Sequence, residues 1–350
     1  MGPAGRGVLE RVRRICAAGA DPRTLRLALL PELRAAAGFD AHAWVLTDPE
    51  SEVGCAPLAD VPALAELPRL IRLRYLEPLN RWTGITEPAA ASLAGATRGE
   101  LSRSLLWREL LDRYGVRDVC SVVFRDRYGC WAFLELWRTR PPPFGAGELA
   151  LLGEIAGPVT AALRRGQAGT FRSRAPTGHP PGPRVLLFSP ELEVVGQTPG
   201  TGEALRILVP RDDGAPPVPA GALNVAAQLL AVEAGVDRHP PEARVHLATG
   251  QWLTLRAARL QGAAPAGNAA IAVTIEECDA RGRLSLFARA CGLSSREAEL
   301  LGHLATGADT GATAQRMFLS PHTVQDHLKS VFAKTGTHTR RALLARALGS

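Results

Sequence analysis

Residues 319–336, LSPHTVQDHLKSVFAKTG, combine hydrogen-bonding side chains with an apolar repeat. Of the 41 Lys and Arg residues in the chain, the two lysines, Lys329 and Lys334, both lie in this stretch. Hydroxyl, amide, imidazole and ammonium groups can hydrogen bond to phosphates and to the edges of nucleic-acid bases. The acid Asp326 lies among them. A carboxylate repels phosphate, but it can accept a hydrogen bond from the cytosine amino group.

The spacing predicts that this stretch forms one amphipathic helix. Ser320 is a favoured N-cap, Pro321 suits the first helical position, and Gly336 is a typical end. Four apolar residues recur at i, i+4, i+7 and i+8 and predict a single buried face: Val324, Leu328, Val331 and Phe332. The opposite face carries four polar residues: His322, Gln325, Asp326 and Lys329.

Three more short helices are predicted around this one. Their starts carry the N-cap residues Ser and Asp, and apolar stripes such as Leu300, Leu301 and Leu304 recur at helical spacing. The predicted bounds are Ser294 or Ser295 to Gly307, Asp309 to Met317, and 338–348. A tight turn between the second and third helices makes a helix-turn-helix, in which the later helix lies in the major groove of DNA.

These residues closely resemble the LuxR-type DNA-binding domain. LSSREAELL matches that family's opening Leu-x-x-Arg-Glu-x-Glu, LSPHTVQDHL its Ser-Pro-x-Thr-Val-x-x-His stretch, and AKTG a form of its Lys-Leu-Gly. The chain departs from the family pattern with Gln325 in place of Lys, GATAQRMF in place of a Glu-Ile-Ala pattern, and Thr335 in place of Leu. The resemblance, over about 60 residues, implies a transcription regulator that docks as a dimer on two half-sites.

The resemblance also implies a set of DNA-binding residues: Ser320, His322, Thr323, Gln325, Asp326, His327, Lys329 and Lys334. Thr323 and Lys334 would contact phosphates, and His327 would either pack or contact phosphate. Gln325, Asp326 and Lys329 would face base edges. The alternative is a helix-turn-helix that has lost its DNA affinity and mediates only protein contacts, for which Gln325 and Asp326 are the best support.

Charge is densest at the C-terminus, as expected if that end meets phosphates. Residues 285–350 hold eight Lys and Arg against four Asp and Glu, whereas the other 284 residues hold 33 against 30. Scatter along the chain could also give a difference of this size. The six cysteines form no CxxC pair and no metal-like spacing with His. The chain has no GxxxxGK[ST], GxSxG or HExxH motif, so we predict no enzyme, no catalytic residues, no cofactor and no metal site.

The order of elements in residues 1–165 predicts a domain of helices around an antiparallel sheet. Its clearest hairpin is VRDVCSVVFRDRYGCWAFLELWR, and the domain resembles a GAF-type sensory domain in its order of elements. Along one strand Trp131, Phe133 and Trp137 alternate, and we expect them to pack in the core and not to line a ligand pocket. Amphipathic helices are predicted over 103–114 and 146–165, and these should support a homodimer.

Residues 166–184 are rich in Pro, Gly, Ser and Arg and predict an exposed linker. Residues 185–278 resemble a PAS-type fold. The predicted fold class is therefore α+β multidomain: two antiparallel-sheet domains, GAF-like and PAS-like, followed by an all-α four-helix helix-turn-helix domain over 285–350.

No apolar run approaches the roughly 20 residues that a bilayer requires, and the N-terminus shows no signal peptide. The chain is therefore expected to be cytoplasmic, with no membrane partner. The expected partners are double-stranded DNA and a second copy of the chain. They could also include RNA polymerase and an unidentified small-molecule ligand.

Overall fold

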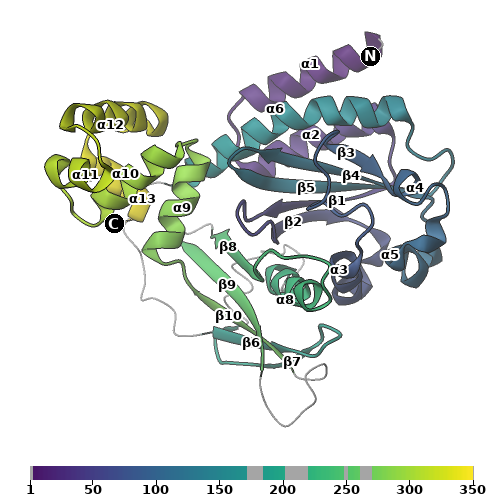
Figure 1. Ribbon diagram of the computed structural model, residues 1–350. Helices are drawn as coiled ribbons and strands as arrows, with labels where there is room; N and C mark the ends of the chain where they lie inside the picture. Colours follow the sequence, from purple (N-terminus) through teal and green to yellow (C-terminus); the bar gives the residue numbers. More distant parts are fainter. Residues whose placement is uncertain (1–2, 172–183, 202–219, 248–250, 261–269, 350) are drawn as a thin grey trace.

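The protein consists of two sheet-containing units followed by a helical unit (Figure 1). The computed structural model describes residues 3–171, 184–201, 220–247, 251–260 and 270–349. Within them, the strands form two five-stranded sheets in which every pairing is antiparallel. The C-terminal unit contains only helices. This confirms the predicted fold class of two antiparallel sheets and a C-terminal helical domain.

The N-terminal unit (residues 3–171) is built on a sheet with strand order β2-β1-β5-β4-β3. Its strands are β1 (Ala41–Thr47), β2 (Gly54–Asp60), β3 (Ala90–Ser92), β4 (Asp118–Asp126) and β5 (Gly129–Arg138). The predicted hairpin pairs Asp126 with Gly129 around its turn. Trp131, Phe133 and Trp137 are at most 4% exposed, so their predicted place in the core is confirmed.

Three helices lie on one side of this sheet: α6 (Ala146–Thr170) packs on the strands, and α1 (Pro3–Ala17) packs on α6 and α2 (Pro22–Ala37). Asp21 caps α2 by accepting hydrogen bonds from the backbone N–H groups of Arg23 and Thr24. By length and composition α6 could span a membrane, but it packs along the sheet and buries residues such as Leu152 and Val159. It is therefore the core helix of this unit.

The exposed linker predicted from residue 166 onward is wrong at its start. Helix α6 continues to Thr170, and Phe171 is fully buried. The Phe171 ring stacks on Trp252, with 5.1 Å between ring centroids, and meets Phe287 edge to face at 5.3 Å. These ring contacts hold the chain against the protein as far as Phe171, so an exposed linker does not begin at residue 166. The rest of the expected linker, 172–183, lies outside the described residues.

Short elements lie on the other face of the sheet: η1 (Pro62–Glu66), α3 (Leu67–Leu76), α4 (Leu93–Ala96), η2 (Leu101–Arg103), α5 (Leu105–Glu109) and η3 (Leu111–Tyr114). The single amphipathic helix predicted over 103–114 is therefore wrong. Its path breaks at Leu110, whose φ of −139° and ψ of −58° are not helical. The break accompanies full burial of both Leu110 and Leu111 in the core of this unit.

The middle unit repeats the strand order of the first. Its strands are β6 (Arg184–Phe188), β7 (Val194–Gln197), β8 (Glu242–His246), β9 (Trp252–Arg259) and β10 (Ile271–Glu277). They are arranged β7-β6-β10-β9-β8. In each sheet the order is thus second, first, fifth, fourth and third, and the first strand pairs with the last.

Helix α8 (Ala220–Glu233) joins the two sheet units (Figure 1). Every residue from 220 to 228 is buried, because the helix contacts β9 of the middle unit and both α3 and β2 of the N-terminal unit. Gly54 permits this close approach, since a Cβ atom there would lie 2.9 Å from the amide nitrogen of Asn224. A helix that is apolar on all sides is stable only when it is enclosed.

Two buried ion pairs cross the same interface. Arg81 of the N-terminal unit donates from both Nε and Nη2 to Asp237 Oδ2, at 3.0 and 2.7 Å. Arg244 of the middle unit holds both carboxylate oxygens of Asp48, at 2.6 and 2.7 Å. All four side chains are at most 5% exposed. Loss of either partner would leave a buried charge without its counterion.

We predict that Asp237→Asn lowers the free energy of unfolding by about 3–5 kcal/mol, because Arg81 stays buried without its partner charge. Urea titration of the full chain measures the change. The matched control is Glu32→Gln, which removes the surface ion pair with Arg11 at 2.7 Å and should cost under about 1 kcal/mol. If the two variants lowered the free energy of unfolding equally, the ion pair of Arg81 with Asp237 would not hold the two sheet units together.

Candidate nucleic-acid interface

The C-terminal unit contains the predicted helices close to their predicted bounds. They are α10 (Ser295–Ala305), α11 (Thr310–Met317), α12 (Pro321–Thr335) and α13 (Arg340–Leu348), preceded by the connecting helix α9 (Ala280–Ala290). Ser294, Asp309 and Ser320 each cap the following helix with a side-chain oxygen. The turn between α11 and α12 is three residues long, which gives the expected helix-turn-helix.

The apolar face of α12 anchors it within the unit. Val324, Leu328 and Val331 are at most 4% exposed, and they join one core with Leu300 and Met317 of the neighbouring helices. Phe332 is only partly buried against that core. Gly336 ends α12 at a φ of 64°. The buried stripe fixes the rotation of α12, and thereby directs its opposite face to solvent.

Asp326 lies between two basic side chains on the exposed face of α12. Lys329 Nζ donates to its Oδ1 at 3.1 Å, and His322 Nε2 lies 3.6 Å from its Oδ2. The hydrogen bond from Lys329 holds the pKa of Asp326 below its usual range, so the carboxylate is charged at neutral pH. All three side chains are more than half exposed. The carboxylate therefore reduces the positive charge of the surface on which it lies.

The other expected contact residues divide between structure and surface. Ser320 accepts from the backbone N–H of Thr323 at 3.1 Å, and the two hydroxyls lie 2.9 Å apart. Gln325 is exposed, and its Nε2 donates to Thr310 Oγ1 at 3.3 Å. His327 is half-buried. The structure thus brings His322, Gln325, Asp326 and Lys329 onto one exposed face, with Ser320 and Thr323 at its start.

Lys334 is placed differently from the rest of the set. Its Nζ contacts both carboxylate oxygens of Glu297, at 2.9 and 2.6 Å, and Ser330 Oγ donates to the same carboxylate at 2.6 Å. Glu297 also accepts from the backbone N–H of Ser294, which closes a capping box at the start of α10. Burial would raise the pKa of Glu297, but these hydrogen bonds lower it to about 2. Lys334 therefore ties α12 to α10.

The helical unit is docked on the rest of the chain through surfaces other than the polar face of α12. Arg346 of α13 donates to the backbone oxygens of Phe171 and Ala168 at the end of α6. Tyr128, in the turn between β4 and β5, donates to the Gly292 backbone oxygen at 2.9 Å. Helix α12 lies at the outer end of the molecule (Figure 1). Its polar face is open in this arrangement.

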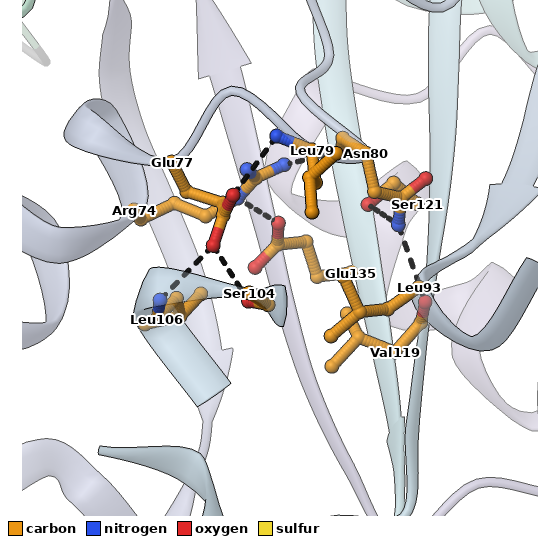
Figure 2. A pocket seen from close by; sticks show the side chains of 10 residues that line it. All are labelled: Arg74, Glu77, Leu79, Asn80, Leu93, Ser104, Leu106, Val119, Ser121 and Glu135. Carbon is orange, nitrogen blue, oxygen red and sulfur yellow. Dashed lines mark hydrogen bonds and ion pairs between the residues drawn. The ribbon is translucent and has the colours of Figure 1, made fainter. Parts of the chain in front are cut away.

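A second candidate site is a small polar cavity of about 10 Å³ in the N-terminal unit, shown in Figure 2, which is room for about one water molecule. Arg74 and Glu135 form an ion pair at its wall. Glu77 accepts hydrogen bonds from Ser104 Oγ and from the backbone N–H groups of Leu79 and Leu106. The cavity walls thus satisfy most of their own hydrogen-bonding groups.

The sequence reasoning missed this set of polar residues, although one signal was available. Glu135 interrupts the strand sequence WAFLELW, where an apolar core strand has no need of a carboxylate. It lies on β5 between Phe133 and Trp137 and is only 4% exposed. Asn80 Oδ1, also at the wall, is buried without a hydrogen-bond partner among the described residues. A water molecule in the cavity could donate to that oxygen.

We predict that Glu297→Gln destabilises the helical unit by about 1.5–3 kcal/mol at pH 7, because it removes charge-assisted hydrogen bonds to a buried carboxylate. Since the pKa falls from 4.5 to about 2 on folding, this stabilisation is complete above pH 4.5 and is lost as the pH falls through about 2. Hydrogen exchange of the α12 amides at a series of pH values measures both effects.

The control for this variant is Glu299→Gln, which removes only the exposed pair with Arg296 at 2.8 Å. It should leave exchange from α12 nearly unchanged. A difference between wild type and Glu297→Gln that persists undiminished at pH 2 would contradict the assigned role.

Residues 292–347 match the family described as bacterial regulatory proteins, luxR family (GerE). The comparison with curated proteins gives no match. Among solved structures, a ligand and DNA complex of VqmA from Vibrio cholera aligns with 47% of this chain and 80% of that chain, at 17% identity. Its TM-score of 0.19 is too low to support an inference about this chain. The family match covers the helices described above: residues 292–347 form a helix-turn-helix domain of the luxR-family type.

Proposed function

We propose that the protein is a sequence-specific transcription regulator that inserts α12 into the major groove of DNA. The observation that carries the proposal is the division of α12 into two faces. Its buried stripe is locked to a luxR-family domain, while His322, Gln325, Asp326 and Lys329 are exposed at the outer end of the molecule. Side chains on the exposed face of a recognition helix hydrogen bond to base edges, and neighbouring polar side chains fix the helix on the phosphate backbone.

Roles for individual residues follow from this geometry. Gln325, Asp326 and Lys329 face the bases, and Ser320, His322 and Thr323 lie at the start of the helix, where phosphates approach. His327 is half-buried and supports the helix. Lys334 keeps its ion pair with Glu297 and can offer its remaining N–H to a phosphate, because an ammonium group has three donors. In this proposal it positions α12 and adds charge.

The proposal assigns sensing to the two sheet units, as a GAF-like domain over 1–165 and a PAS-like domain over 185–278. The shared strand order supports that assignment. A small-molecule ligand would bind to one of these units, and a homodimer would place two copies of α12 on two half-sites. The regulator would act in the cytoplasm, without a catalytic step, together with RNA polymerase.

A second candidate is a protein-interaction module whose helix-turn-helix no longer holds DNA. One observation favours it: both lysines of the domain are paired with acids, Lys329 with Asp326 and Lys334 with Glu297. Such pairing leaves less positive charge for phosphates. Binding of DNA by the full chain separates the two candidates.

We expect the full chain to retard random duplex DNA at low salt, with an affinity that falls steeply as salt rises, because phosphate contacts release counterions. Titrations at three or more salt concentrations give the slope. Failure to retard DNA at the lowest salt would exclude the regulator and favour the interaction module.

Asp326→Ala should tighten binding to random DNA, because it removes a repelling charge and frees Lys329 from its ion pair. It should also weaken the preference at one base pair by about 1–3 kcal/mol, since a carboxylate can accept from cytosine. Selection of sites from a random duplex library, run on wild type, Asp326→Ala and Lys329→Ala, measures both quantities.

Lys329→Ala is the matched comparison on the same helix face. It should weaken binding to all sequences if the ammonium holds phosphate, or at one position if it contacts guanine. If Asp326→Ala changes neither the selected motif nor the affinity for random DNA, the carboxylate is only a solvated surface group.

A further inference from the structure

Phe318 is the most exposed large hydrophobic side chain among the described residues, with 94% of its surface open to solvent. It lies in the turn between α11 and α12, two residues before the N-cap Ser320. A phenylalanine ring left in water contributes nothing to the core of its own domain. A single exposed apolar residue is ordinary on a protein surface, so exposure alone does not indicate a role.

The backbone at Phe318 provides a second, independent observation. Its φ of 54° and ψ of 46° are left-handed, a conformation that is sterically unfavourable for a bulky side chain. The same domain ends α12 with Gly336 and α13 with Gly349, both at positive φ. Glycine would make the α11 turn without steric strain or an exposed ring. Both the exposed ring and the left-handed backbone are unfavourable, and the ring packs against nothing in the described part of its own domain. A contact with another molecule would account for a phenylalanine at this position.

The place of the turn identifies that molecule. The chain runs from Phe318 directly into α12, and the first residues of a recognition helix contact the base edges. An exposed apolar side chain in the turn just before that helix would then lie near the edge of the groove, where sugar rings and thymine methyl groups offer apolar contacts. His322, 86% exposed, follows four residues after Phe318 in the first turn of α12.

We propose that Phe318 packs against DNA at the rim of the major groove and supplies an apolar part of the binding affinity. The inference rests on the proposed function and adds a contact of a different physical kind. A phenyl ring displaces no counterion, so its contribution does not depend on salt. Lys329, by contrast, would change the salt dependence by about one counterion if it holds phosphate.

The test compares Phe318→Gly with wild type in the full chain, using duplexes from the selection experiment. We expect binding to weaken by roughly tenfold, which is close to the lower end of the value of burying a phenylalanine ring. The slope of log affinity against log salt should stay unchanged. The thermal midpoint should stay equal or rise, because glycine relieves the left-handed strain. Lower affinity with undiminished stability cannot come from a damaged fold.

Two further variants serve as controls. Phe318→Leu keeps an apolar side chain and should retain affinity to within about threefold. Val195→Ala shortens a side chain that is 59% exposed on β7, outside the C-terminal unit, and should have no effect. If glycine loosens the turn, Phe318→Asn repeats the test with a residue that also tolerates the left-handed conformation.

Several outcomes would overturn the inference. If wild type binds DNA and Phe318→Gly binds equally well, the ring does not contact DNA, while the proposed function stands. If Phe318→Gly binds DNA normally but loses transcription with RNA polymerase, or loses a dimer in light scattering, the ring contacts protein. If wild type itself fails to bind DNA, the proposed function fails first.

Discussion

The burial of α8 is the constraint on which the arrangement of the sheet units depends. From residue 220 to residue 228, no face of this helix is exposed to solvent. It must lie between β9 on one side and α3 with β2 on the other, because an apolar helix is stable only when it is enclosed. The ion pairs of Arg81 and Arg244 in the same interface would each leave a buried charge if the units separated. The two sheets therefore behave as one body, to which Phe171, Trp252 and Phe287 join the connecting helix α9.

In the C-terminal helical unit, the pairing of charged side chains matters more than their number. Glu297 fixes Lys334, and Asp326 takes a hydrogen bond from Lys329. The first pair is partly buried and orders the fold, whereas the second is exposed and weakened by salt. A surface with its cations partly neutralised should hold non-specific DNA less tightly, so that correct base contacts carry a larger share of the affinity.

The C-terminal domain could be predicted closely from the sequence because its signals are local. N-caps, the helical repeat of Val324, Leu328 and Val331, and glycine at the helix end all act within one turn or two. The ion pair of Lys334 with Glu297 could not be predicted in the same way, since 37 residues separate its partners. Packing between units decided the rest. The helix expected over 103–114 breaks where Leu110 and Leu111 both enter the core, and α6 runs past residue 165 because Phe171 docks against the middle unit.

The strand order shared by the two sheets has a consequence for how the chain folds. In each sheet the first strand pairs with the last. Strand β1 therefore cannot complete its pairing until β5 is present, and β6 cannot complete its pairing until β10 is present. During synthesis neither sheet can close until its final strand has emerged, and α8 stays without its full cover until both have closed. Contacts so distant along the chain slow folding, whereas the short-range contacts of α10 to α13 favour speed. The helices α10 to α13, which are made after both sheets, are therefore the quickest to form, and they meet a body that has only just been completed.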